Sequence, residues 1–206
     1  MTAPALSSEK LHKAFSLIRQ PDSITCGPTC LVMVARALTI LNGKTPLAEP
    51  GTNGVLSGYA NLIVATGKAM GTCFEFGTRH IEMAAGLRLF GLPVVRSIGG
   101  VDPENDTGEP AKLVRLDAED ILSGALHEGN AVILRTLWHG CKHWMLLYSD
   151  GEKLFLLDPC SSVPAEIDQE LMREIVNAWA KRGYDGFSVS LRSGEPHIPN
   201  QIMSAA

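Results

Sequence analysis

The chain has 206 residues, of which 45% are hydrophobic and 19% are charged, as in an ordinary globular protein and unlike a disordered chain. Its formal net charge of -4 offers no broad basic surface, so we expect neither nucleic acid nor a membrane as a partner. The length fits one compact domain, and residues 1–206 are therefore treated as a single domain.

The N-terminal residues show no conventional secretory signal. The chain opens with Met-Thr-Ala-Pro-Ala-Leu-Ser-Ser-Glu-Lys, without the basic start and apolar run of a secretory signal. The longest apolar stretch, residues 31–41, is too short to span a bilayer. We expect a cytoplasmic protein, with export by a specialised secretion system as the alternative. The odd number of cysteines, five, favours reduced thiols over a disulfide framework.

Helical patterns fill the first half of the chain. Residues 8–19 carry apolar side chains at helical spacing after Ser8, a candidate N-cap, and residues 28–41 are apolar on nearly every face, as in a buried central helix. The elements expected up to residue 110 are helices at 8–19, 28–41, 55–68 and 79–90, a strand at 92–98 and an exposed loop at 99–110.

Strand patterns dominate the second half. A turn at Asp150-Gly151 separates two apolar runs of strand length, which predicts an antiparallel meander. The expected elements are a helix at 117–127 capped by Asp117, strands at 131–137, 143–148 and 153–157, a helix at 166–181 and a strand at 187–191. Helices first and a sheet second indicate an α+β fold.

Cys26 is placed to be a nucleophile. It lies in Gln-Pro-Asp-Ser-Ile-Thr-Cys-Gly-Pro-Thr-Cys, in a predicted turn just before the central helix, with Gly27 allowing a tight backbone and Pro28 suited to the first helical position. The dipole and unpaired amides of a helix N-terminus favour negative charge, and hence the thiolate form of a cysteine placed there.

Three more residues complete a hydrolytic set. His143, in Lys-His-Trp-Met-Leu-Leu-Tyr, and Asp158, in Leu-Phe-Leu-Leu-Asp-Pro, lie on either side of the Asp150-Gly151 turn, so antiparallel pairing can bring them together. An imidazole oriented by a carboxylate is what a thiol nucleophile requires. Gln20, six residues before Cys26, could supply an oxyanion donor or could simply begin the turn with Pro21.

This ordered set resembles the papain-like cysteine peptidase superfamily. The Cys-Gly-Pro-Thr-Cys and His…Leu-Asp-Pro forms are most similar to the branch of bacteriocin leader-processing (double-glycine) peptidases. The resemblance implies a helical part packed on an antiparallel sheet, with Cys26 as nucleophile, His143 as general base and acid, Asp158 as orienter and Gln20 as oxyanion donor. The chain departs by lacking a fused transporter sequence and by a long insertion between Cys26 and His143, which leaves the substrate open.

Alternative interpretations exist for several of these residues. His139, Cys141 and His143 form a His-x-Cys-x-His cluster that could bind a metal with Cys26 or Cys30 as a further ligand, but such a site leaves Asp158 and Gln20 unexplained, so we expect no metal and no cofactor. His139 is a rival base that precedes the strand opened by His143. Core positions are expected for Cys30 and Cys73, and surface positions for His12, His80, His127 and His197.

Three functions fit the sequence. The first is a thiol hydrolase that cleaves a peptide bond through an acyl-thioester on Cys26, with a peptide or protein substrate and, as a further possible partner, an inhibitor or immunity protein. The second is a papain-like glutamine deamidase or acyltransferase acting as a bacterial effector or toxin. The third is a catalytically silent binding module, for which a broken triad would be expected.

Overall fold

The computed structural model describes residues 6–45, 57–72, 77–98 and 115–192, together with 196 and 202. The loop expected at 99–110, Cys73 and His197 lie outside the described residues. Within the described ranges no helix combines the length and apolar character needed to cross a bilayer.

A six-stranded antiparallel sheet organises the fold. Its strand order is β1-β6-β2-β3-β4-β5, so the expected meander of the second half forms its β2-β3-β4 part. The strands are β1 (Val94–Ile98), β2 (Asn130–Trp138), β3 (Cys141–Ser149), β4 (Leu154–Leu157), β5 (Ala165–Glu166) and β6 (Gly186–Ser190).

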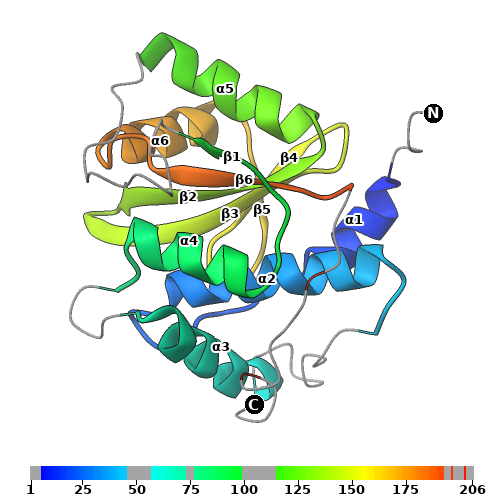
Figure 1. Cartoon of the computed structure of the whole chain (residues 1–206). Coiled ribbons are helices and arrows are strands. Elements are labelled where there is room, and N and C mark those ends of the chain that lie inside the picture. Colours follow the sequence, from blue (N-terminus) through cyan, green and yellow to red (C-terminus); the bar gives the residue numbers. More distant parts are fainter. Residues whose placement is uncertain are drawn as a thin grey trace.

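Helices cover both faces of the sheet, with α2 and α4 on one face and α5 and α6 on the other (Figure 1). The helices are α1 (Ser8–Ala14), α2 (Cys26–Leu41), α3 (Ser57–Met70), α4 (His80–Leu89), α5 (Arg115–His127) and α6 (Gln169–Ala180). The α+β class predicted from the sequence is confirmed.

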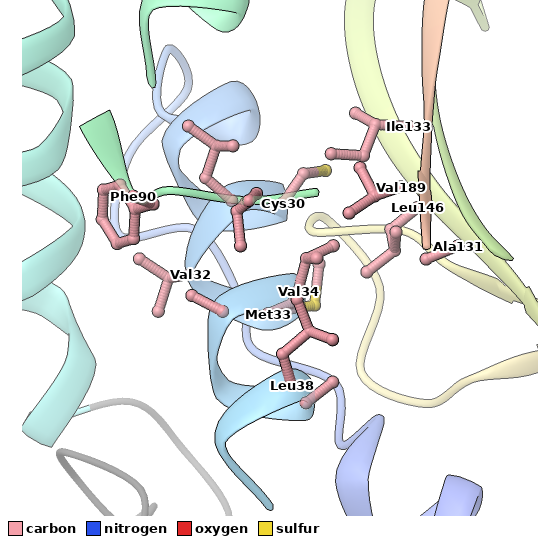
Figure 2. Packing of buried hydrophobic residues seen from close by; sticks show 14 of the residues in the cluster. Cys30, Val32, Met33, Val34, Leu38, Phe90, Ala131, Ile133, Leu146 and Val189 are labelled. Atoms are coloured by element: carbon pink, nitrogen blue, oxygen red, sulfur yellow. The ribbon is translucent and has the colours of Figure 1, made fainter. Parts of the chain in front are cut away.

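The sheet is buried on both faces, which explains its apolar runs. In β2, Ala131 and Ile133 belong to the core shared with α1 to α4, whereas Val132 and Leu134 belong to the core shared with α5 and α6. Alternate side chains of a strand point to opposite faces, so both sets must be apolar. Figure 2 shows the first core, where α2 presents Cys30 and Val34 toward the sheet.

The first helix is shorter than its sequence pattern. Helix α1 ends at Ala14, and its N-cap is Ser7, whose hydroxyl accepts from the Lys10 amide at 3.3 Å, so the expectation of Ser8 as cap was wrong. Phe15 nevertheless remains buried, because its ring stacks on Tyr148 with centroids 4.4 Å apart. The apolar spacing of this segment therefore reflects packing on the sheet and not continued helix.

Two other helix starts differ from expectation. Helix α5 begins at Arg115, so Asp117 lies in the first turn and not at the N-cap position expected for it. Helix α6 begins at Gln169, three residues later than expected, because the Asp168 carboxylate accepts from the Leu171 amide at 2.8 Å and closes the N-terminus. A capping side chain fixes a helix boundary that hydrophobic periodicity alone leaves open.

Candidate active site

Cys26 is the first residue of α2, which begins two residues earlier than expected. The Asp22 carboxylate accepts from the amides of Ile24 and Thr25 at 2.9 Å each and folds the preceding loop. The helical ladder starts with Thr29 N donating to Thr25 O at 2.9 Å, so the Cys26 amide precedes it. Pro28 therefore occupies the third helical position and not the first, which costs no intrahelical hydrogen bond.

Gly27 provides space for a neighbouring loop. A Cβ atom at this position would lie 2.5 Å from Thr78 Oγ1 and 2.7 Å from Thr78 Cβ. The Thr78 carbonyl in turn accepts from Trp144 Nε1 at 2.8 Å. The glycine, explained from the sequence by a tight backbone, is required because the Thr78 loop packs directly on the start of α2.

The β3-β4 hairpin brings His143 and Asp158 together. Leu146 pairs with Leu157, so the residue after Leu157 lies near the start of β3. His143 Nε2 lies 2.7 Å from Asp158 Oδ1, which also accepts from the Cys160 amide at 2.8 Å. His143 is only 7% exposed. The pairing expected from the hairpin geometry is present.

Electrostatics hold this pair charged. Burial alone would lower the pKa of His143, but hydrogen bonds with Asp158 and Cys26 and the charges of both groups raise it to about 9. Burial would raise the pKa of Asp158, yet the hydrogen bonds from His143 and the Cys160 amide, together with the His143 charge, lower it below its usual value. The arrangement therefore favours an imidazolium at His143 beside a carboxylate at Asp158.

Gln20 is tied to the same region by its main chain. Its amide donates to the Pro159 carbonyl at 3.0 Å, which links the segment before Cys26 to the residue after Asp158. Its side-chain Nε2 donates to the Asp22 carbonyl at 2.5 Å, and Oε1 is buried without a hydrogen-bond partner among the described residues. The side-chain amide thus lies in the loop that leads to Cys26.

The described residues do not assemble the His-x-Cys-x-His cluster. The one group of three potential ligands found among them is His143, Asp158 and Cys160, whose ligand atoms lie within 4.8 Å of one another. His139 lies in the exposed β2-β3 turn with φ 46°, whereas His143 is buried within β3. Cys160 was not predicted to lie at the site, although its position two residues after Asp158 already places it near that carboxylate.

Other expectations have mixed outcomes. Cys30 is fully buried in the core, as expected, and burial together with the charges of Cys26, Asp158 and Cys160 raises its thiol pKa well above the usual value. His127 is exposed, as expected. The surface expectation for His80 was wrong, because this side chain is 5% exposed, stacks on Phe187 and hydrogen-bonds to Asp185 through Nδ1.

A pocket of about 270 Å³ adjoins Cys26 and His143. Thr78 and Trp144 form part of its wall, and Arg135 and Lys142 also line it. None of these four was assigned a role from the sequence, since a strand pattern alone cannot show that Arg135 and Lys142 face the space beside a distant cysteine.

No family description matches the chain, and no curated protein matches it either. Among solved structures, the chain is similar to the peptidase domain of Streptococcus ComA, a bifunctional ABC transporter involved in quorum sensing. The identity is 16% and the TM-score 0.50, over 85% of this chain and 96% of that domain. The fold is thus papain-like, as expected from the sequence.

Proposed function

We propose that the protein is a cysteine peptidase that hydrolyses a peptide bond through an acyl-thioester on Cys26. The observation that carries the proposal is the 2.7 Å contact between His143 Nε2 and Asp158 Oδ1, on an imidazole that also interacts with Cys26 at the start of α2. A nucleophile, a base and an orienting group gathered at one site support acyl transfer more specifically than any one of them.

In the proposed first step, the Cys26 thiolate attacks the carbonyl carbon of the scissile bond. A C–S bond forms, and the carbonyl oxygen becomes an oxyanion that accepts hydrogen bonds from the Cys26 amide and the Gln20 side-chain amide. His143 then gives its proton to the departing amine nitrogen as the C–N bond breaks, leaving an acyl-thioester.

In the second step, neutral His143 removes a proton from water, and the resulting hydroxide attacks the thioester carbonyl. The C–S bond breaks, the acyl fragment leaves as a carboxylic acid, and the thiolate–imidazolium pair is restored. Asp158 keeps the ring oriented and its charge stabilised throughout, without itself changing protonation.

The first experiment is alkylation by iodoacetamide across pH, resolved by site with mass spectrometry. Cys26 should react selectively near neutral pH although it is only 5% exposed. Cys160 is a built-in control, because it is exposed yet burial of its thiol and the charges of Asp158 and Cys26 raise its pKa. His143→Ala should slow labelling of Cys26 and leave Cys141 labelling unchanged.

A peptide library then tests the reaction itself, with Cys26→Ala as the inactive reference. Cleavage that disappears in this variant would support the peptidase. Release of ammonia from glutamine without chain cleavage would identify a deamidase instead. Cys26 alkylation no faster than that of Cys160, together with no product from any peptide, would contradict catalysis by Cys26.

A further inference from the structure

The pocket beside Cys26 and His143 is cationic. Arg135 and Lys142 line it, and no aspartate or glutamate is among the described residues of its wall. The whole chain carries a net charge of -4, so this local excess of positive charge runs against the protein's overall balance. A cationic recess next to a nucleophile concentrates anionic groups of a substrate.

Arg135 is held in position, unlike a freely moving surface arginine. It pairs with Trp144 across β2 and β3, and its guanidinium carbon lies 5.9 Å from the centre of the Trp144 ring. Its NH1 group lies 3.3 Å from Asp185 Oδ2, and the side chain is 16% exposed. A guanidinium fixed by an aromatic face and one carboxylate loses little entropy when it binds a further ligand.

The Asp185 carboxylate does not neutralise this cluster. Its other oxygen, Oδ1, is hydrogen-bonded to His80, so the one carboxylate serves both His80 and Arg135. Burial and the repulsion from Arg135 lower the pKa of Arg182, while Asp185 raises it less. Arg182 Nε is also buried without an acceptor among the described residues. Arg135 thus has one 3.3 Å contact with a carboxylate that His80 also binds, and it would be stabilised by a second anion.

We propose that this pocket is a specificity subsite that binds a carboxylate of the substrate, with Arg135 as the fixed ligand and Lys142 as a rim cation. The inference rests on the proposed function and names its substrate class: peptides with an acidic group close to the scissile bond. The carboxylate can come from an aspartate or glutamate side chain or from the free C-terminus of the peptide, and the two sources share this chemistry.

Paired reactive probes test the subsite without knowledge of the natural substrate. Peptidyl vinyl sulfones, which alkylate active-site cysteines, are made with glutamate, glutamine or lysine at each position before the reactive group. The readout is the ratio of Cys26 labelling rates for the glutamate and glutamine probes. At the best position the wild type should favour glutamate by about tenfold or more, because charged hydrogen bonds to a guanidinium contribute that much.

Variants assign the preference to the pocket. Arg135→Gln should bring the glutamate-to-glutamine ratio close to one, Arg135→Lys should retain part of it, and Lys142→Gln should lower it partially. Arg173→Gln, an exposed position on α6 outside the pocket lining, should leave the ratio unchanged. Because both probes meet the same protein sample, a loss of folded protein does not alter the ratio. Rising salt should lower the wild-type ratio.

A second arm separates the two carboxylate sources. Peptides with a free C-terminus, and the same peptides with an amidated C-terminus, compete with a neutral probe for labelling of Cys26. If the free acids compete more strongly in the wild type but not in Arg135→Gln, the site binds a terminal carboxylate. Equal rates for the glutamate and glutamine probes, together with equal competition by free and amidated peptides, would overturn the subsite. The proposed function would survive that result if iodoacetamide still labels Cys26 selectively. A preference for the lysine probe also overturns it. Absence of any selective Cys26 labelling removes the proposed function and this inference together.

Discussion

His143 Nε2 lies 2.7 Å from Asp158 Oδ1 across a hairpin whose turn is at Asp150-Gly151. Because Nε2 is engaged by the carboxylate, Nδ1 is the ring nitrogen left for the proton exchange that we propose with Cys26. The carboxylate thus fixes the orientation of the ring.

The raised pKa of His143, about 9, sets an upper pH limit for the proposed reaction. The imidazolium that protonates the leaving amine is present below this pH and is lost as pH rises through it, so kcat/KM should fall on the alkaline side near pH 9. Asp158→Asn removes the largest cause that raises this pKa and should move the alkaline limb to lower pH. The pH profile of peptide hydrolysis measures the shift.

Asp168→Asn is the control for that variant, because Asp168 caps α6 and is not among the residues that shift the His143 pKa. Its alkaline limb should match the wild type. An unchanged limb in Asp158→Asn would mean that another group sets the alkaline side of the profile.

Gln20→Ala tests the proposed oxyanion donor. Turnover should fall by roughly 10²–10³, the usual effect of removing one such donor. The rate of Cys26 alkylation by iodoacetamide should change little, because that reaction forms no oxyanion. Both quantities, kcat for a cleaved peptide and the rate of Cys26 labelling, are measured for the wild type and for Gln20→Ala. Gln169→Ala, at an exposed position opening α6, is the matched control. Equal losses in turnover and alkylation would instead point to a displaced Cys26.

Local patterns were sufficient to predict the proximity of His143 and Asp158. A helix start marks Cys26, and a hairpin turn fixes which residues of two adjacent strands are close. The neighbours brought in by tertiary packing were not predictable in this way. Thr78 reaches Gly27 from 51 positions further along the chain, and Asp185, the residue before β6, joins His80 at the start of α4, so no short sequence window contains either contact.

Burial of both faces of the sheet also left parts of the fold unpredictable from the sequence. Strand β2 is apolar on both faces, so its pattern predicted a strand but could not show which face meets α2. The histidines outside the predicted site, including His80, were expected at the surface because the sequence shows no partner for them. His80 departs from that preference because Asp185 compensates its burial, which only the assembled fold makes visible.

Gly27→Ala should disturb the pocket without touching the proposed catalytic groups. The added Cβ would lie 2.5 Å from Thr78 Oγ1, so the Thr78 loop must move, at a cost of about 1–3 kcal/mol of unfolding free energy. Urea unfolding measures the cost. Gly124→Ala on α5 is the control, since nothing lies within 4 Å of its new Cβ, and it should be neutral or stabilising. Thr78→Gly should offset the effect of Gly27→Ala; simple addition of the two losses would contradict the proposed contact.

Asp150→Ala should destabilise the hairpin that aligns His143 with Asp158. The carboxylate accepts from the amides of Glu152 at 2.9 Å and Lys153 at 2.7 Å. It also accepts from the Ser8 hydroxyl at 2.9 Å, which ties α1 to the turn. Removing these charged hydrogen bonds should lower the free energy of unfolding by about 2–3 kcal/mol at neutral pH.

The pH dependence of that loss follows from the Asp150 pKa. Burial would raise it, but hydrogen bonds from Lys153, Glu152, Ser8 and His12 lower it to about 2, below its ordinary value near 4. A depressed folded-state pKa gives stability that is fully present above pH 4 and lost as pH falls through 2. The difference between wild type and Asp150→Ala in urea unfolding should therefore be constant from pH 7 to 5 and shrink between pH 4 and 2. Glu152→Ala is the control, because it keeps the main-chain amide that donates to Asp150, and its difference in unfolding free energy from the wild type should not change in this way with pH. A difference for Asp150→Ala that does not depend on pH would mean that the carboxylate charge does not stabilise the turn.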